Sequence, residues 1–181
     1  MPETVWASAS RCGHPRAAPR RALGENVARG HDTPEGVTSA WLASDGHCAN
    51  VMNPAAVVLV DEARSQPRTC GATAYAATHP LAAEPRLTAA AQRHSDDMHA
   101  NGFMSHTGSD GSSLRQRVER EGYAWSRVGE NVAWGYGSPE AVMVGWLSSP
   151  GHCANIMRPE HTEIGLGLAG THWTQVFAHP R

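Results

Sequence analysis

Residues 24–54 and 129–159 are two copies of one segment, aligned without a gap at an offset of 105 positions. They share 19 of 31 residues, including Gly-Glu-Asn-Val-Ala at the start and Gly-His-Cys-Ala-Asn near the end. Identity this high over an ungapped stretch indicates an internal duplication. Any fold for this chain must therefore place the same segment twice.

The two copies have unequal surroundings. Only 23 residues precede Gly24, and Pro54 leads directly into the apolar run Ala55–Val60. The second copy has a full set of expected elements before it and two strand-like runs after it. We therefore predict that residues 1–53 are an incomplete copy that does not fold independently, and that residues 54–181 form one complete domain. The helix expected near Pro34–Ala43 would have no sheet of its own to cover its apolar face.

Local patterns predict the elements of the complete copy. Apolar residues recur on one face of Leu87–Asn101, and Gly102 provides a left-handed stop. Ser113-Leu114-Arg115-Gln116 is a capping box, and Ser138-Pro139-Glu140 begins a helix that Pro150-Gly151 breaks. The other expected elements are a helix at Val57–Arg64, a loop at Gln66–Ala83, and strands at 128–134, 163–169 and 172–178. Helices interleaved with antiparallel strands predict an α+β fold.

Composition excludes several kinds of partner and chemistry. The formal net charge of −2 provides no basic field for nucleic acid and no polybasic stretch for a membrane surface. All 15 basic residues are arginine, which excludes a Schiff-base lysine and a P-loop. No apolar run is long enough for a transmembrane helix, and Met1–Trp6 lacks the pattern of a signal peptide.

Five segments of the complete copy occur in an order typical of one superfamily. They are Ala89–Met98, Phe103–Gly111, Gly122-Tyr123 with Val128–Asn131, Trp146–Met157, and Trp173–Phe177. Each alone is a weak signal, but all five in order over nearly 90 residues are specific. The chain resembles the CAP superfamily (cysteine-rich secretory, antigen five and pathogenesis-related proteins; the SCP-like domain) in its compact bacterial form.

The resemblance implies a three-layer α/β/α sandwich with a central antiparallel sheet, and a surface cleft where histidines and acids meet. Carried onto this chain, the cleft residues are His106, Glu130 and His152. Two imidazoles and a carboxylate suit Zn²⁺ or another divalent cation, with the two histidines as ligands, and they equally suit acid–base chemistry. Many relatives carry a second glutamate on the helix with the tryptophan, but Trp146–Ser149 contains no acid. A simpler alternative is that both histidines only hydrogen-bond loop backbone.

Other polar residues are expected to be structural. Asn131 and Asn155 are predicted to form turns or buried hydrogen bonds, and Trp146 is predicted to lie in the core. Ser105 is adjacent to His106 and would point to the opposite face of a strand, which argues against a serine nucleophile. Surface or packing positions are expected for His79, His94, His99, His161, His172 and His179.

Four cysteines allow three pairings, and spacing alone does not choose among them. Each copy has a Cys-Gly upstream and a Gly-His-Cys-Ala-Asn downstream, which favours Cys70–Cys153 in the complete domain and Cys12–Cys48 in the fragment. Disulfides indicate an oxidising compartment. With the resemblance, they predict an extracellular or periplasmic protein, although no signal peptide is visible.

Two functions follow from these observations. The first is a ligand-binding module that holds a small molecule, lipid, glycan or protein without catalysis. The second is a metal-assisted hydrolase, most plausibly a peptidase, that uses His106, Glu130 and His152. The missing second acid and the lack of a nucleophile motif favour the first. The truncated repeat also permits a rearranged gene product with no selected function.

Overall fold

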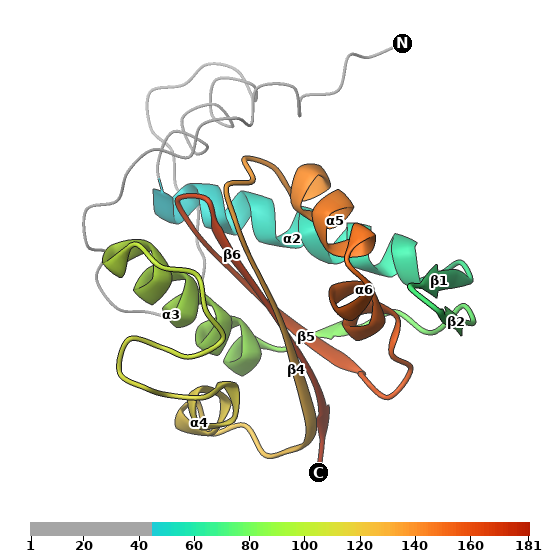
Figure 1. Ribbon diagram of the computed structural model, residues 1–181. Coiled ribbons are helices and arrows are strands. Elements are labelled where there is room, and N and C mark those ends of the chain that lie inside the picture. The colour runs from blue at the N-terminus through green and yellow to red at the C-terminus, as the bar shows by residue number, and fades with distance from the viewer. Residues whose placement is uncertain (1–44) are drawn as a thin grey trace, which may run out of the picture.

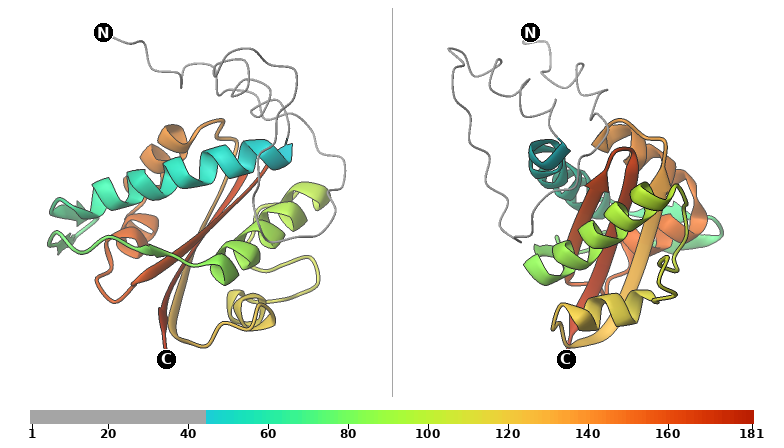
Figure 2. Two further views of the ribbon diagram at one scale, coloured as in Figure 1. Left: turned by 180° about the vertical axis from the view of Figure 1, so that it is seen from behind. Right: turned by 90° about the vertical axis from the view of Figure 1, so that its left-hand side faces the viewer.

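The computed structural model describes residues 45–181, with side chains from Pro54 onward. The helix expected near Pro34–Ala43 and the pairing of Cys12 with Cys48 therefore lie outside the described residues. Three helices, α2, α5 and α6, cover one face of a twisted sheet, while α3 and α4 lie on its other face (Figure 1; Figure 2). This is the predicted three-layer α/β/α arrangement.

The sheet has the order β3-β5-β6-β4. Strands β4 (Trp125–Trp134), β5 (Glu163–Ala169) and β6 (His172–Pro180) are antiparallel, as predicted. The β5–β6 hairpin turns at Gly170, whose φ of 57° suits glycine. A short strand, β3 (Ala82–Ala83), adds in parallel to β5 within the segment that we expected to be a loop.

Alternation along the strands separates two apolar cores. Toward α2, α5 and α6, the sheet presents Ile164, Leu166, Leu168, Trp173 and Phe177, which pack around the buried Trp146. Toward α3 and α4, it presents Val176 and Ala178. Gly165 and Gly167 alternate with these apolar residues of β5, and a Cβ at either glycine would overlap the backbone of α3. Glycine therefore lets α3 pack directly on the strand.

The helices on the α3 side begin and end as the sequence predicts. Helix α3 (Pro85–Asn101) buries Leu87, Ala90, Ala91, His94 and Met98 and ends at Gly102, which has a φ of 65°. Helix α4 (Leu114–Arg120) begins with the capping box between Ser113 and Gln116.

Two helix boundaries on the other side differ from the prediction. Helix α2 spans Asp45–Arg64 with Pro54 inside it, whereas we expected a helix only from Val57. Helix α5 (Pro139–Ser148) begins at the Ser138 cap as predicted. Pro150, which we expected only to end this helix, is also the first residue of a further helix, α6 (Pro150–Met157). A proline at the first helical position loses no hydrogen bond, because that N–H has no partner within a helix.

A disulfide ties a small hairpin to α6. Strands β1 (Arg68–Cys70) and β2 (Thr73–Tyr75) form a separate two-stranded sheet inside the expected loop. Cys70 is bonded to Cys153 of α6, with their Cα atoms 5.5 Å apart, which confirms the predicted pairing.

The last residue of α2, Arg64, is fully buried and was not singled out by the sequence. Its guanidinium donates to the carbonyl oxygens of Ile156 (2.6 Å), Arg158 (3.1 Å), His161 (3.2 Å) and His79 (2.8 Å). Burial lowers the pKa of Arg64. Four carbonyl dipoles thus replace water around this charge and join α2 to the segments that flank α6 and β3.

Candidate functional site

His106 and Glu130 form the pair that the sequence analysis placed at the centre of the site. His106 lies in the segment between α3 and α4, and Glu130 lies in the middle of β4, opposite Val176 of β6. The His106 Nδ1 atom is 2.8 Å from the Glu130 Oε1 atom. The His106 side chain is 59% exposed, whereas that of Glu130 is only 3% exposed. The pair therefore joins an accessible ring to a buried carboxylate.

Arg117 of α4 completes this pair, and the sequence analysis missed it. Its Nη2 donates to the Glu130 Oε2 at 2.6 Å, and its side chain is 7% exposed. Its Nη1 donates to the carbonyl oxygens of His106 (3.1 Å) and Ser112 (2.9 Å). Arg117 therefore neutralises the buried carboxylate and holds both ends of the loop that carries His106.

His94 of α3 holds the residue before His106. Its Nε2 lies 2.7 Å from the carbonyl oxygen of Ser105, and its ring is buried. Because a carbonyl oxygen only accepts hydrogen bonds, Nε2 must carry the proton. Burial lowers the pKa of His94, which favours this neutral form. His94 is thus a packing residue, as predicted, that also fixes the His106 loop.

The pKa of His106 shifts in the opposite direction. The hydrogen bond with Glu130 raises the pKa of this ring, and partial burial opposes the rise. The protonated ring is therefore stabilised by the Glu130 carboxylate, against partial burial and the charge of Arg117.

His152 lies in the first turn of α6, next to the disulfide residue Cys153. Partial burial lowers the pKa of His152, and the charge of His106 lowers it further. The carbonyl oxygen of His152 accepts a hydrogen bond from Asn131 Nδ2 at 3.2 Å. This contact fixes the start of α6 against the strand that carries Glu130.

Asn131 and Asn155 form the buried hydrogen bonds predicted for them. Asn155 Nδ2 donates to Asn131 Oδ1 at 2.9 Å and to the Glu130 carbonyl oxygen at 3.1 Å. Asn131 Nδ2 also donates to Gln175 Oε1 at 3.0 Å. The two amides therefore set the position of Glu130 relative to α6 without contacting a ligand surface.

Known proteins with similar sequences settle the family. The family model described as "CAP: Cysteine-rich secretory protein family" matches residues 57–177. The chain belongs to the CAP family. The match spans the sheet, all the helices from α3 onward, and the three residues proposed for the site.

Two relatives of this CAP domain are described as uncharacterized. The chain is 34% identical over 100 residues to the uncharacterized protein YkwD of Bacillus subtilis, covering 54% of this chain and 39% of that protein. It is 34% identical over 84 residues to the uncharacterized membrane protein YlbC of the same organism, covering 46% of this chain and 24% of that protein. The matched part of the chain thus spans well under half of the length of each of these curated relatives.

Solved structures share the fold. An extracellular protein containing an SCP domain from Bacillus anthracis has a TM-score of 0.68 and 25% identity, covering 83% of this chain and 45% of that one. An outer surface protein from Borrelia burgdorferi has a TM-score of 0.57 and 19% identity, covering 68% of this chain and 91% of that one. No helix among residues 45–181 is both long enough and apolar enough to cross a bilayer.

The residues of this CAP domain limit how a metal could bind. Both carboxylate oxygens of Glu130 are hydrogen-bonded, one to His106 and one to Arg117. Glu130 therefore fits as the residue that orients a metal-binding histidine, and not as a metal ligand itself. With Nδ1 facing Glu130, the Nε2 of His106 is the nitrogen left for a metal, the arrangement found in carboxylate–histidine–zinc triads. No three acidic, histidine or cysteine side chains of the described part are grouped to hold an ion. A site shared by His106 and His152 remains a prediction.

Two cavities found in the described part of the CAP domain are lined by neither His106 nor His152. One, of about 240 Å³, lies behind the His106 loop and is lined in part by His94 and Arg117. The other, of about 470 Å³, lies between the β1–β2 hairpin and the end of α6. The larger cavity is therefore not at the histidines, and His106 lies on an exposed surface.

Proposed function

We propose that this CAP domain is an extracellular or periplasmic ligand-binding module whose binding surface is centred on His106, with Glu130 and His152 beside it. One observation carries the proposal: an exposed histidine ring is held by a buried Glu130–Arg117 ion pair. Burying a carboxylate and a guanidinium costs several kcal/mol per ion before their attraction offsets it. A domain that needed only stability would do as well with apolar residues there.

The arrangement of His106 and His152 suits a ligand that has an oxygen or another hydrogen-bond acceptor. Because its pKa is raised, His106 can donate through Nε2 when it is protonated, and the lowered pKa of His152 favours a neutral ring. A divalent cation such as Zn²⁺ fits the same pair of rings, with Glu130 orienting His106. Bound there, the cation would act as a Lewis acid toward an oxygen of a small molecule, lipid, glycan or protein.

Two observations support the location. Cys70 and Cys153 form a disulfide between buried sulfurs, a bond that persists in oxidising compartments. Structural relatives are described as an extracellular protein and an outer surface protein.

Titration calorimetry with ZnCl₂ tests the site. Because the chain has 11 histidines, the informative quantity is the difference between variants. We expect binding to the wild type that His106→Ala and His152→Ala each weaken by about tenfold or more, and that Glu130→Gln weakens by about 10- to 100-fold. His179→Ala, which changes an exposed histidine on β6, is the matched control. Zinc affinity that is the same in all four variants would contradict the shared site.

A hydrolase is the second candidate, favoured by one contact. The Nδ1 atom of His106 faces the buried Glu130 carboxylate. In many enzymes, a carboxylate orients a general-base histidine in the same way. Metal analysis separates the two functions: stoichiometric zinc that is lost together with a peptidase activity supports the enzyme. Zinc binding without any turnover supports the binding module.

A further inference from the structure

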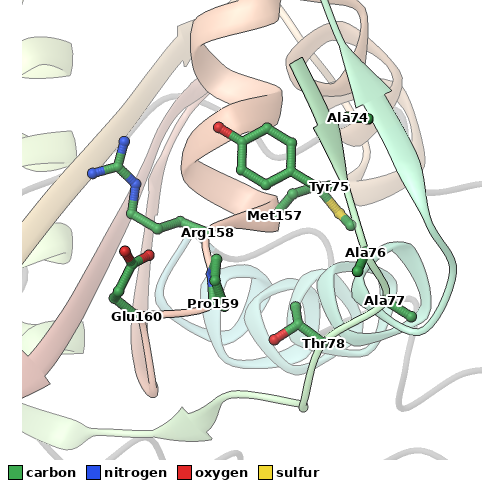
Figure 3. A pocket seen from close by; sticks show the side chains of 9 residues that line it. All are labelled: Ala74, Tyr75, Ala76, Ala77, Thr78, Met157, Arg158, Pro159 and Glu160. Carbon is green, nitrogen blue, oxygen red and sulfur yellow. The ribbon is translucent and has the colours of Figure 1, made fainter.

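The cavity of about 470 Å³ is not lined by His106, Glu130 or His152. One wall is the continuous segment Ala74–Thr78, and the other is Met157–Glu160, the end of α6 and the turn after it (Figure 3). Its volume of about 470 Å³ is within the range of pockets that hold ligands. None of its lining residues belongs to the His106 surface, so a ligand here would serve a separate function.

At one end, Arg64 links the two walls, because its carbonyl oxygen accepts from the Thr78 N–H and its guanidinium donates to the Arg158 carbonyl oxygen. The walls are also joined at the other end. There the Cys70–Cys153 disulfide links the β1–β2 hairpin to α6. At the turn of the hairpin, Gly71 lies so close to Pro150 that an added Cβ would be 2.9 Å from the proline Cβ. The groove lies between the residues that follow this contact, with Ala74–Thr78 on one side and Met157–Glu160 on the other.

Strand β2 forms an edge with free main-chain groups. Cys70 pairs with Thr73 across a two-residue turn, so the antiparallel alternation directs the N–H and C=O of Ala74 away from β1. Within residues 54–181, no backbone or side-chain partner bonds the main chain of Ala76 or Ala77 either. Thr78 ends this stretch by donating its N–H to the Arg64 carbonyl oxygen at 2.8 Å.

This edge also lacks the usual protection against pairing. Edge strands commonly carry charges or proline that block a further strand. Residues 73–78 read Thr-Ala-Tyr-Ala-Ala-Thr, and the alanines at 74, 76 and 77 are exposed. An uncharged, exposed edge next to a cavity is the geometry by which proteins bind peptides through strand addition.

The side chains of the groove favour a particular residue in such a peptide. Tyr75 extends from β2 across the groove, and Met157 and Pro159 provide further apolar surface (Figure 3). Arg158 is half-buried, and its guanidinium has no ion pair or hydrogen bond with any described residue. Glu160 is exposed on the rim, where water screens its charge. The groove thus offers an apolar floor that ends at one unpaired cation.

We propose that this groove binds an extended peptide that adds as a third strand at the β2 edge and carries a glutamate for Arg158. Main-chain pairing with Ala74 and Ala76 provides affinity, and every second side chain of the added strand enters the cavity. The methylene groups of a glutamate there pack on Tyr75 and Met157, and its carboxylate accepts hydrogen bonds from Arg158.

Fluorescence polarisation on the full 181-residue chain tests the proposal, with the capped and labelled peptide Val-Thr-Glu-Thr-Val as the probe. We expect Arg158→Gln to weaken binding about tenfold, the effect of one charged hydrogen bond. A peptide with lysine for glutamate should bind poorly to the wild type and better to Arg158→Glu. Glu160→Gln, a charge change on the rim, should leave the affinity for the glutamate peptide unchanged or slightly higher.

Main-chain pairing has its own test. Methylating alternate amide nitrogens of the probe keeps its side chains but removes the donors that face β2, and binding should then be lost. Because the Arg158 guanidinium makes no hydrogen bond or ion pair with a described residue, its variants should keep the wild-type melting temperature, which checks their folding. Absence of binding at about 1 mM probe, equal binding of the methylated peptide, or indifference to Arg158→Gln would each overturn the proposal.

Discussion

The Nδ1 atom of His106 lies 2.8 Å from Oε1 of Glu130, across 24 residues of sequence and from an exposed loop to a buried strand. Arg117 binds the other carboxylate oxygen and the His106 carbonyl oxygen. One carboxylate thus determines where the exposed ring lies.

Glu130→Gln should destabilise the domain, because it leaves Arg117 buried without a counter-ion. Breaking a buried pair in this way costs about 3–5 kcal/mol. Urea denaturation at neutral pH measures the change in unfolding free energy. The double variant Glu130→Leu/Arg117→Met should cost less than Glu130→Gln alone, because it removes both charges. A double variant that costs the sum of the single changes would show that the two side chains do not act as a pair.

Replacing Cys70 and Cys153 together by alanine should lower the unfolding free energy by about 4 kcal/mol, because the bond closes a long loop. The two cysteines are 83 residues apart, and both are buried. The measurement is urea denaturation of both proteins with and without dithiothreitol. Reductant should destabilise the wild type more than the double variant. Labelling of Cys70 and Cys153 by a thiol reagent in the unreduced native protein would refute the pairing.

Stability should fall as the pH is lowered from about 6.5 toward 4. Burial lowers the pKa of His161 to about 4, and its ring is stacked on Phe177. An unfolded histidine titrates near pH 6.5, so between these values the unfolded chain binds a proton that the folded chain does not. The loss amounts to about 3 kcal/mol by pH 4. His161→Gln should flatten this dependence in urea titrations at several pH values, and an unchanged slope would contradict the assignment.

Gly165→Ala should destabilise the fold by at least about 3 kcal/mol, the upper range for overpacking. A Cβ at this position would overlap the backbone of Leu87 and Thr88, which a side-chain rotation cannot relieve. Gly151→Ala in α6 is the matched control, because nothing lies within 4 Å of its Cβ position. That change should be neutral or stabilise by up to about 1 kcal/mol. Thermal melts of both variants measure the contrast, and equal melting temperatures would exclude direct packing of α3 on β5.

Deleting residues 1–53 should leave the melting temperature of the remaining domain nearly unchanged. The described core residues of α2 are Ala56, Val60 and Ala63, and all of them follow Pro54. The shortened chain therefore keeps the apolar contacts by which α2 covers the sheet. A large drop in the melting temperature would show that the N-terminal copy is a structural part of the domain.

Local sequence signals predicted the elements that depend on neighbours in the chain. Leu87–Met98 repeats apolar residues at helical spacing, Ser113 and Gln116 cap each other, and the strand at 163–169 alternates leucines with glycines. Each of these signals lies within one element, so no knowledge of the fold was needed to interpret it. The strands of the β1–β2 hairpin and β3 have two or three residues each, too few for alternation to be visible.

The site was predictable only as far as the family resemblance reached. His106, Glu130 and His152 came from that resemblance, and their separations of 24 and 22 residues carry no local signature. Arg117 and Arg64 were missed because an arginine on a helix is normally exposed, and only tertiary contacts distinguish these two. The buried environment of His94 is likewise a property of the packed layers.

The strand order has a consequence for synthesis. β6 is the last of the described strands, yet it lies inside the sheet and pairs with both β5 and β4. Neither apolar core can close before residues 172–180 have left the ribosome, because both cores include residues of β6. The nascent domain therefore stays open until its last described strand has been synthesised, so the two cores close together after translation of that strand.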